Sequence, residues 1–264
     1  MFDPGKRHLV SSCRMVVNYC RAYELFSDDT YRELAQHGLD YIRDRHWDET
    51  RTGFNWTLTD GHVADDQTNH GYGLAFVILA SAAADKIGMA GAKEDLVRAW
   101  DIMEARLWDK TIGRYADEAS ADWSEVSQYR GQNANMHSCE ALIEAYEATG
   151  DERFLDRAYV LARAITVQLA GKSDGLIWEH FTSDLDIDWE YNADDPQNLY
   201  RPWGFQPGHQ TEWSKLLLTL HGHRPEEWVV VRAVELFDRA LESCWDHENG
   251  GIFYSLAPDG TICD

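Results

Sequence analysis

Helical hydrophobic patterns that come in pairs constrain the fold of this sequence more than any other feature. In residues 8–26, apolar side chains from Val10 to Cys20 recur at the i, i+3, i+4 spacing of one helix face. Ser27 or Asp28 then caps a second helix. The other predicted helices cover residues 67–87, 91–107, 135–150, 151–171, 209–222 and 225–244. The chain is therefore predicted to be all-α, with helices in consecutive hairpins.

A short motif recurs between the hairpins. Trp followed by an acidic residue, and then by glycine and an aromatic residue, occurs at Trp47, Trp108 and Trp245, and a degenerate copy occurs at Trp178. The tryptophans are spaced about 60–70 residues apart, with two predicted helices per interval. Such a period is typical of a helical array in which each hairpin buries its apolar face on the next.

Long segments join the hairpins, at residues 47–65, 108–129 and 171–207. Loops of this length in a compact fold usually build a functional site, so they favour a closed α/α toroid over an open solenoid. A closed toroid normally needs more hairpins than the four that are predicted from this sequence. We therefore expect residues 1–264 to form a single, incomplete α/α-barrel domain, as a fragment of a longer one.

The charge balance excludes two classes of partner. The formal net charge is −22, with 46 acidic residues against 24 Lys and Arg. Such an acidic surface repels nucleic acid and anionic membranes, and no apolar run approaches the ~18–20 residues of a membrane span.

The five cysteines are Cys13, Cys20, Cys139, Cys244 and Cys263. Their odd number and the lack of CxxC spacing predict reduced thiols and a cytoplasmic location.

The segment RPWGFQPGHQTEW, residues 201–213, places a histidine directly after Pro-Gly at the predicted start of a helix. The backbone N–H groups of a helix start disfavour imidazolium, which predicts a lowered pKa for His209 and a neutral base near pH 7. Glu212 shares the helix face of His209 and could orient its ring or bind a substrate hydroxyl. The alternative is a histidine at a helix cap beside a solvated glutamate.

The segment RGQNANMHSCE holds a second polar cluster. At 100° per residue, Asn133, His137 and Glu140 fall within about 60° of one another on a helix. This arrangement suits a polyol, because an amide and an imidazole can both hydrogen-bond hydroxyl groups. The alternative is a loop-to-helix junction with Asn133 as cap and His137 satisfied in the core.

Two further residues are candidates for ligand contacts. Arg14 lies within the apolar first helix, where a partly buried guanidinium needs an anion or several acceptors, such as a carboxylate of the next hairpin. Tyr72 begins an apolar helix, where a core position is the default. Metal binding by His209 and His137 stays open, although the sequence contains no compact ligand set. There is no GxGxxG, P-loop, HExxH or GxSxG motif.

Together, RGQNANMHSCEAL (residues 130–142) and RPWGFQPGHQTEWSKLLL (residues 201–218) resemble the N-acylglucosamine 2-epimerase superfamily, in its mannose isomerase-like branch. Weaker similarity extends from CRMVVNY near the start to WDHENGGIFYSLAPDG near the end. The resemblance implies an (α/α)6 barrel with a sugar in its central cavity. It also implies proton transfer at C2 of the sugar through a cis-enediol, without a metal or redox cofactor.

The resemblance assigns roles to six positions. It implies His209, His137 and Glu212 as catalytic residues, and Arg14, Tyr72 and Asn133 as substrate-binding residues. The sequence departs from the family pattern in two ways. Leu74 stands where many relatives carry histidine, and the second catalytic histidine of the family is expected beyond residue 264.

The expected function is that of an aldose–ketose isomerase for a small sugar such as mannose, and the 11 Trp, 12 Tyr and 9 Phe provide ring faces that suit sugars. A sugar 2-epimerase is the first alternative, because a second acid could return the proton to the opposite face of C2. The helical repeats are also compatible with a scaffold that binds peptides, and an α/α toroid can host an inverting glycoside hydrolase. The candidate acids of such a hydrolase are Asp184, Asp186, Asp188 and Glu190. Apolar faces without their neighbouring hairpins would favour association, so a homo-oligomer is one expected assembly.

Overall fold

The computed structural model describes residue 3 and residues 5–198 and 200–263, and it confirms all eight predicted helices within these residues. The helices are α1 (Leu9–Phe26), α2 (Asp29–Tyr41), α3 (Gly71–Lys86), α4 (Ala92–Arg106), α5 (Asn133–Thr149), α6 (Glu152–Arg163), α7 (Pro207–His223) and α8 (Glu227–Cys244). None of them combines the length and the apolar character needed to cross a bilayer.

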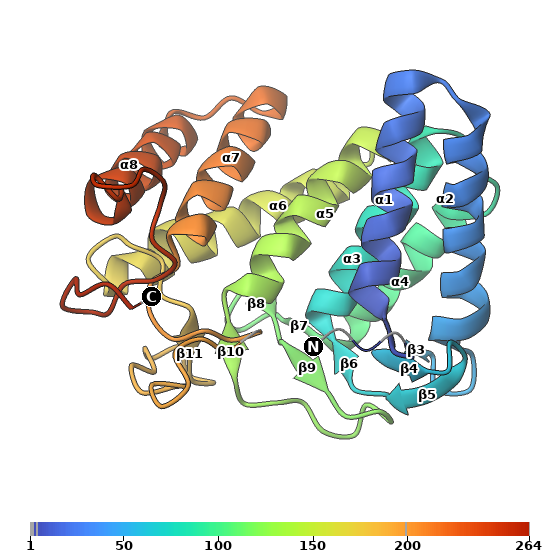
Figure 1. Cartoon of the computed structure of the whole chain (residues 1–264), viewed down its shortest axis with the longest axis horizontal. Helices are drawn as coiled ribbons and strands as arrows, with labels where there is room; N and C mark the ends of the chain where they lie inside the picture. Colours follow the sequence, from blue (N-terminus) through green and yellow to red (C-terminus); the bar gives the residue numbers. More distant parts are fainter. Residues whose placement is uncertain (1–2, 4, 199, 264) are drawn as a thin grey trace.

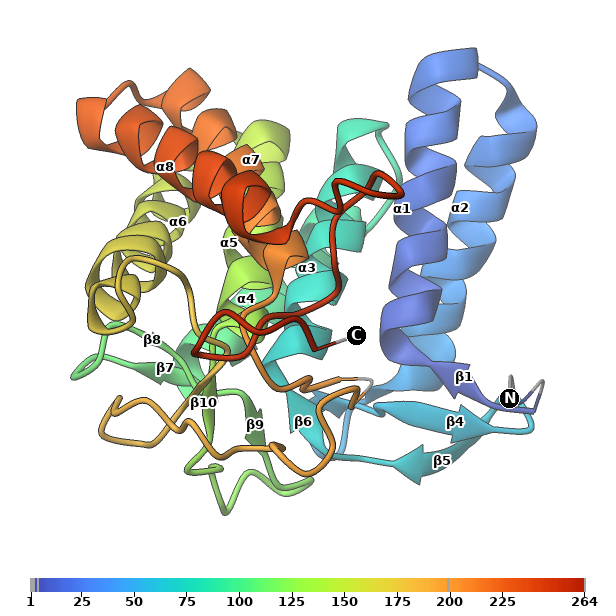
Figure 2. The same ribbon diagram turned by 60° about the vertical axis from the view of Figure 1, so that its left-hand side comes forward.

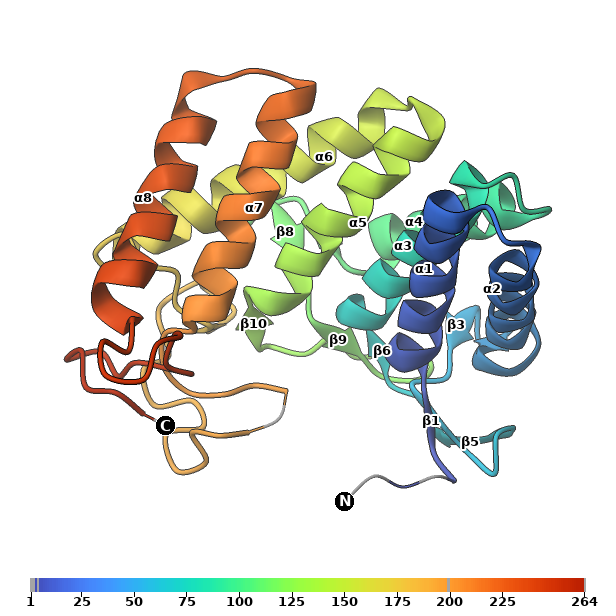
Figure 3. The same cartoon turned by 45° about the horizontal axis from the view of Figure 1, so that its top comes forward.

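The helices form two layers of an α/α toroid. α1, α3, α5 and α7 pack side by side as the inner layer, and α2, α4, α6 and α8 each cover the inner helix that precedes them (Figures 1 and 3). α3 is buried on nearly all sides because α1, α4 and α5 all pack against it. The predicted array of hairpins, each burying its face on the next, is therefore confirmed.

Local signals explain most helix ends. The Asp28 carboxylate accepts a hydrogen bond from the Thr30 backbone N–H, as a helix cap does. α5 ends at Gly150, whose φ of 71° favours glycine. The predicted helix over residues 151–171 is not one regular α-helix. The α-helix α6 ends at Arg163, and the chain then forms a π-helical turn and a 3₁₀ turn.

The recurring Trp motif folds into short antiparallel hairpins at the ends of the outer helices. The paired strands are β2 (Trp47–Asp48) with β3 (Gly53–Phe54), and β7 (Trp108–Asp109) with β8 (Arg114–Tyr115). Trp245 pairs with Ile252 in the same way. The degenerate copy differs, since Trp178 is fully buried and is followed by β11 (His180–Phe181), which pairs with β10 (Arg130–Gly131).

The acidic residue of the motif closes the hairpin turn. Asp48 Oδ1 accepts hydrogen bonds from the backbone N–H groups of Thr50 and Arg51, at 3.0 and 3.2 Å. Asp246 Oδ1 accepts from the Glu248 N–H at 2.8 Å in the third copy. A side chain that satisfies the backbone of its own turn explains why an aspartate follows the tryptophan.

The remaining short strands complete a polar end of the helical array. β1 (Arg7–His8), β4 (Thr57–Thr59) and β5 (Val63–Asp66) form one antiparallel sheet, and β6 (Asn69–His70) pairs with β9 (Glu118–Ala119). The strands gather at one end of the helices (Figure 2). β6 and β10 lead directly into the inner helices α3 and α5, so this end presents several inner-helix starts together.

Candidate active site

A histidine–glutamate pair occupies the start of α7. Pro207 is the first residue of the helix, a position that suits its fixed φ, and His209 follows in the first turn as predicted. His209 Nδ1 lies 2.9 Å from Oε1 of Glu179, whose side chain is only 3% exposed. The partner of His209 is thus Glu179, in the long segment before α7, and not Glu212.

Trp213 fixes the orientation of the Gln132 amide beside this pair. The Trp213 indole can only donate, and its Nε1–H donates to Gln132 Oε1 at 2.7 Å. Gln132 Nε2 must therefore be the donor to Glu179 Oε2, at 2.9 Å. Gln132 Nε2 also lies 2.9 Å from His209 Nδ1, so both groups meet at the same carboxylate. A proton on His209 Nδ1 lets Glu179 Oε1 accept a hydrogen bond, whereas the other tautomer would place a nitrogen lone pair against a carboxylate oxygen. The contact with Glu179 therefore favours the tautomer with the proton on Nδ1. The lone pair of a neutral His209 then lies on Nε2.

The environment of His209 corrects the predicted direction of its pKa. Burial lowers the pKa of His209, but the adjacent Glu179 carboxylate attracts and hydrogen-bonds the imidazolium more strongly. The charge of Glu212 adds to this attraction, and the net result is a pKa above the usual 6.5. The lowered pKa predicted from the helix start was wrong, because a buried carboxylate in direct contact raises the pKa of His209 more than the helix dipole lowers it.

Glu212 belongs to a second cluster on the inner helices. His137 Nδ1 lies 3.0 Å from Glu140 Oε2, and Lys215 Nζ lies 3.3 Å from Glu140 Oε1. Burial would raise the pKa of Glu140, but these two partners lower it to about 2. Ligand atoms of His137, Glu140 and Glu212 all lie within 4.8 Å of one another.

These three side chains offer one imidazole nitrogen and two carboxylates, a donor set that divalent transition metals accept. The structure therefore corrects two expectations: a compact ligand set exists, and His209 is not part of it. The Lys215 ammonium competes with any cation for Glu140.

Arg14 and Tyr72 lie on the inner helices α1 and α3 and contact each other. Arg14 Nη2 donates to the Tyr72 hydroxyl at 3.2 Å, and its guanidinium lies 4.7 Å from the centre of the Phe76 ring. The Tyr72 ring meets the His137 ring edge-on at 5.0 Å. Arg14 is exposed rather than partly buried, and no carboxylate pairs with it among the described residues. Leu74 is buried in the hydrophobic core.

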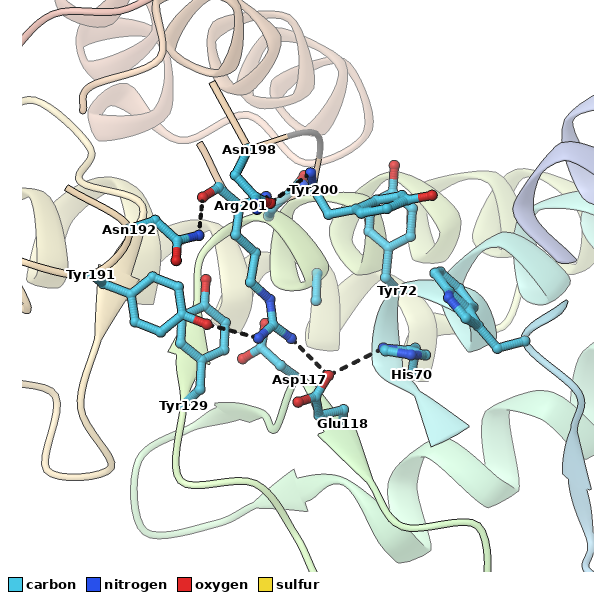
Figure 4. Close-up of a pocket in the computed structure, with 13 residues that line it drawn as sticks. His70, Tyr72, Asp117, Glu118, Tyr129, Tyr191, Asn192, Asn198, Tyr200 and Arg201 are labelled. Carbon is cyan, nitrogen blue, oxygen red and sulfur yellow. Dashed lines mark hydrogen bonds and ion pairs between the residues drawn. The ribbon is translucent and has the colours of Figure 1, made fainter. Parts of the chain in front are cut away.

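Two neighbouring cavities open at the end of the inner helices where the short strands gather. The smaller has a volume of about 350 Å³ and is lined by Asn133, Tyr200, Pro202, Gln206, Gly208, His209, Ile252, Phe253 and Tyr254. The larger has about 440 Å³ and is lined chiefly by Trp56, His70, Tyr72, Asp117, Glu118, Tyr129, Asn133, Tyr191, Tyr200 and Arg201 (Figure 4). Both include Asn133, whose Oδ1 is buried without a hydrogen-bond partner among the described residues.

Arg201 organises the larger cavity. It donates from Nη2 to Glu118 Oε2 at 2.7 Å and from Nη1 to the Tyr191 hydroxyl at 2.9 Å, and its guanidinium lies 4.2 Å from the centre of the Tyr129 ring (Figure 4). His70 Nδ1 lies 3.4 Å from Glu118 Oε2, and burial lowers the pKa of His70 to about 4, so the imidazole is neutral at pH 7.

Several site residues were missed from the sequence. Gln132 adjoins Asn133 in the quoted RGQNAN segment, Glu179 is the acid that follows Trp178, and Arg201 begins the RPWG segment. All three residues adjoin motifs that the sequence analysis had singled out. Their spacing along the sequence, however, gave no indication that Gln132 and Glu179 contact His209. The four acids proposed for a hydrolase, Asp184, Asp186, Asp188 and Glu190, line neither cavity, so the geometry gives that alternative no support.

Asp117 is buried in the wall of the larger cavity, where it accepts a hydrogen bond from the Gly131 N–H at 2.7 Å. A Cβ on residue 131 would lie only 2.7 Å from Asp117 Oδ1, so glycine is required for this approach. Burial raises the pKa of Asp117 to about 7, although Gly131 and Arg201 act in the opposite direction. The carboxyl therefore binds a proton at a much higher pH than an exposed aspartate does.

We expect the substitution Asp117→Asn to raise the free energy of unfolding at pH 8, and to raise it much less at pH 5.5. A carboxyl whose folded-state pKa lies above its unfolded value makes the free energy of unfolding fall as the pH rises between the two values, here about 4 and about 7. The neutral amide lacks this loss, which is worth up to about 4 kcal/mol. Urea unfolding from pH 5.5 to 8.5 measures the difference, and parallel profiles for the two proteins would contradict it.

The comparison with protein families gives one match over the whole sequence. The profile of the N-acylglucosamine 2-epimerase (GlcNAc 2-epimerase) family matches residues 1–264. D-mannose isomerase of Marinomonas mediterranea is 49% identical over 265 residues, which cover 100% of this chain and 67% of that protein. D-mannose isomerase of Thermobifida fusca is 34% identical over 231 residues, which cover 86% of this chain and 57% of that protein.

Solved structures agree with this relationship. A crystal structure of D-mannose isomerase superposes with a TM-score of 0.96 at 49% identity, over 100% of this chain and 67% of the other. Cellobiose 2-epimerase from Spirochaeta thermophila superposes with a TM-score of 0.75 at 18% identity, over 99% of this chain and 81% of the other, which establishes a common α/α-barrel fold. By its sequence and its fold, the chain belongs to the N-acylglucosamine 2-epimerase family.

Proposed function

We propose that the protein is a sugar isomerase that interconverts an aldose of the mannose type with its ketose. The observation that carries this proposal is the His209–Glu179 pair beside the smaller cavity. Glu179 engages Nδ1, so Nε2 of the neutral ring is available to accept a proton from a bound sugar. The 49% identity to a D-mannose isomerase supports the choice of substrate.

The chemistry moves one proton between C2 and C1 and one between O2 and O1, and it needs no external oxidant or reductant. His209 Nε2 takes the proton from C2 of the open-chain aldose, the C2–H electron pair forms the C1=C2 bond, and O1 is protonated to give a cis-enediol. The hydroxyl on C2 then releases its proton, which balances the proton taken up by O1. C2 becomes the carbonyl carbon, and the proton held by His209 returns to C1. Because the proton that moves between the carbons stays on one face, His209 alone can remove it from C2 and return it to C1.

The walls of the cavities supply groups that can bind the sugar. Asn133 reaches both cavities, and its unpartnered Oδ1 can accept a hydrogen bond from a sugar hydroxyl. Arg14 and Tyr72 provide a cation and a hydroxyl on the neighbouring inner helices, and these can stabilise negative charge on O1 or O2. The rings of Trp56 and Tyr200 can pack against the C–H face of a sugar.

The 2-epimerase alternative is favoured by one observation, the His137–Glu140 pair on α5. A second histidine with its own carboxylate could hand a proton to the opposite face of C2, which inverts that carbon instead of isomerising the sugar. His137 also faces Tyr72, so it lies on the inner wall near the proposed sugar-binding groups.

Proton NMR of D-mannose in D2O with the full-length protein tests the proposal. We expect D-fructose to appear with solvent deuterium at C1, and His209→Gln to suppress both signals. Deuterium at C2 with formation of the C2 epimer of mannose, or exchange at C2 of N-acetylmannosamine, would instead identify an epimerase. No conversion or exchange with any of these sugars would overturn the assignment to this chemistry.

A further inference from the structure

Two arginines are buried next to the candidate site without an ion-pair partner among the described residues. Arg114 on β8 is 2% exposed and Arg130 on β10 is 8% exposed. Arg114 Nε donates to the Ile112 carbonyl at 3.3 Å, while its Nη1 is buried without a hydrogen-bond partner in the described part of the chain. Arg130 donates from Nη1 to two backbone carbonyls, and its Nε is likewise buried and unpartnered. Both guanidinium groups stay charged at any physiological pH.

The side chain of Asn135 holds the two arginine-bearing strands together. Asn135 Oδ1 accepts from the Tyr115 N–H at 2.9 Å, and its Nδ2 donates to the Tyr115 and Gly131 carbonyls at 3.0 and 3.2 Å. Tyr115 follows Arg114 in the sequence, and Gly131 follows Arg130. The Asn135 bonds therefore hold the two strands close to each other, and burial together with repulsion by Arg130 lowers the pKa of Arg114 to about 10.

The neighbouring carboxylates form no ion pair with either arginine among the described residues. Asp109 is the cross-strand partner of Arg114, but its Oδ1 accepts from the Thr111 N–H at 2.8 Å. Asp117 attracts Arg130 from a distance, but its Oδ2 is engaged by the Gly131 N–H. Neither arginine has a carboxylate oxygen within 4.0 Å in residues 5–198 and 200–263. Two adjacent buried cations without a counter-charge are strongly destabilising.

We propose that a small monovalent anion, a halide such as chloride, binds between Arg114 and Arg130 and accepts hydrogen bonds from Arg114 Nη1 and Arg130 Nε. Neither arginine lines one of the two cavities described above, and both are nearly inaccessible, so a single-atom anion suits the site better than a bulky phosphate ester. The proposal does not depend on the proposed isomerase activity. It has a consequence for the site, because β10 continues into Gln132 and Asn133. The anion would thus stabilise the strand that positions both residues.

Diffraction from crystals grown in sodium bromide tests the site directly, because bromide scatters anomalously. We expect an anomalous peak within hydrogen-bonding distance of both guanidinium groups in the wild-type protein. An absence of the peak, with both unpartnered nitrogens bonded to water, would overturn the proposal.

Thermal unfolding tests whether the anion binds in solution. With ionic strength held constant, replacing sodium gluconate by sodium chloride should raise the wild-type Tm by roughly 2–4 °C, since an anion that binds only the folded state stabilises it by mass action. Arg114→Met keeps the apolar stem and removes one cation. We expect this variant to lose the chloride response and to be more stable than the wild type in gluconate, because the repulsion with Arg130 is gone.

Arg157→Met is the matched control, because Arg157 is also largely buried but is paired with Glu104 at 2.6 Å. It should lose stability and keep the chloride response. A wild-type Tm that does not depend on chloride, or an equal response in Arg114→Met, would overturn the proposal even if bromide were seen in the crystal. If Arg114→Met fails to fold, the wild-type chloride titration and the bromide map still decide the question.

Discussion

His209→Gln is expected to reduce kcat/KM for the isomerisation of D-mannose by at least about 10³-fold, which corresponds to about 4 kcal/mol of lost transition-state stabilisation. Glutamine has a similar size, and its amide N–H can still donate to Glu179, so the buried carboxylate keeps a partner. The substitution removes only the nitrogen that can accept the C2 proton. Steady-state kinetics, together with deuterium exchange at C2, measures the effect.

His221→Gln provides the control for this prediction. His221 lies near the opposite end of α7, where its Nδ1 contacts the backbone of Glu226, and it lines neither cavity. We expect nearly wild-type kinetics for this variant and a Tm close to that of His209→Gln. A His209→Gln protein that is folded and retains activity within about tenfold of the wild type would exclude His209 as the base.

Glu179→Gln is expected to lower kcat by roughly 10²-fold or more, because it places an amide where two donors converge. Gln132 cannot turn to relieve the conflict, since its Oε1 is held by Trp213. If the new NH2 faces His209, it forces the lone pair onto Nδ1 and the proton onto Nε2, and the base is lost. If the NH2 faces Gln132, two donors meet in a buried site.

The same variant should move the acidic limb of the pH–rate profile to lower pH. The active form of His209 is neutral, so activity falls as the pH decreases through its pKa. In the wild type Glu179 raises that pKa, and without the carboxylate the burial of the ring lowers it. The profile of kcat/KM against pH therefore distinguishes loss of the carboxylate from general damage to the site.

Glu190→Gln is the matched control, because Glu190 is exposed in the segment that also carries Glu179 and lines neither cavity. Its rate and its pH profile should match the wild type. An unchanged rate and an unchanged acidic limb in Glu179→Gln would show that His209 does not depend on Glu179.

The helices and their pairing could be predicted from the sequence because these features depend on neighbours within a few residues. The i, i+3, i+4 pattern of α1, the Asp28 cap and the Gly150 stop each act within one or two turns. The same holds for the position of His209, since Pro207 marks the start of α7. The strands were not predicted, since most of them are only two residues long and are formed by pairing between distant segments.

The composition of the site depended on contacts that span long stretches of sequence. His209 meets Glu179, 30 residues before it, and Gln132, 77 residues before it. The inner helices bring Arg14 next to Tyr72 over 58 residues. No periodicity encodes such pairs, and spacing along one helix suggested Glu212 as the partner of His209, which was wrong.

The sequence by itself determined an all-α array, the two polar segments that build the site, and the position of His209 on the first turn of a helix. Only the tertiary structure decided that Glu179 holds Nδ1, that the pKa of His209 is raised, and that Arg14 is exposed. The physical reason is that helix formation is a local process. Desolvation and Coulomb attraction instead depend on distances between segments, and these exist only once the chain has folded.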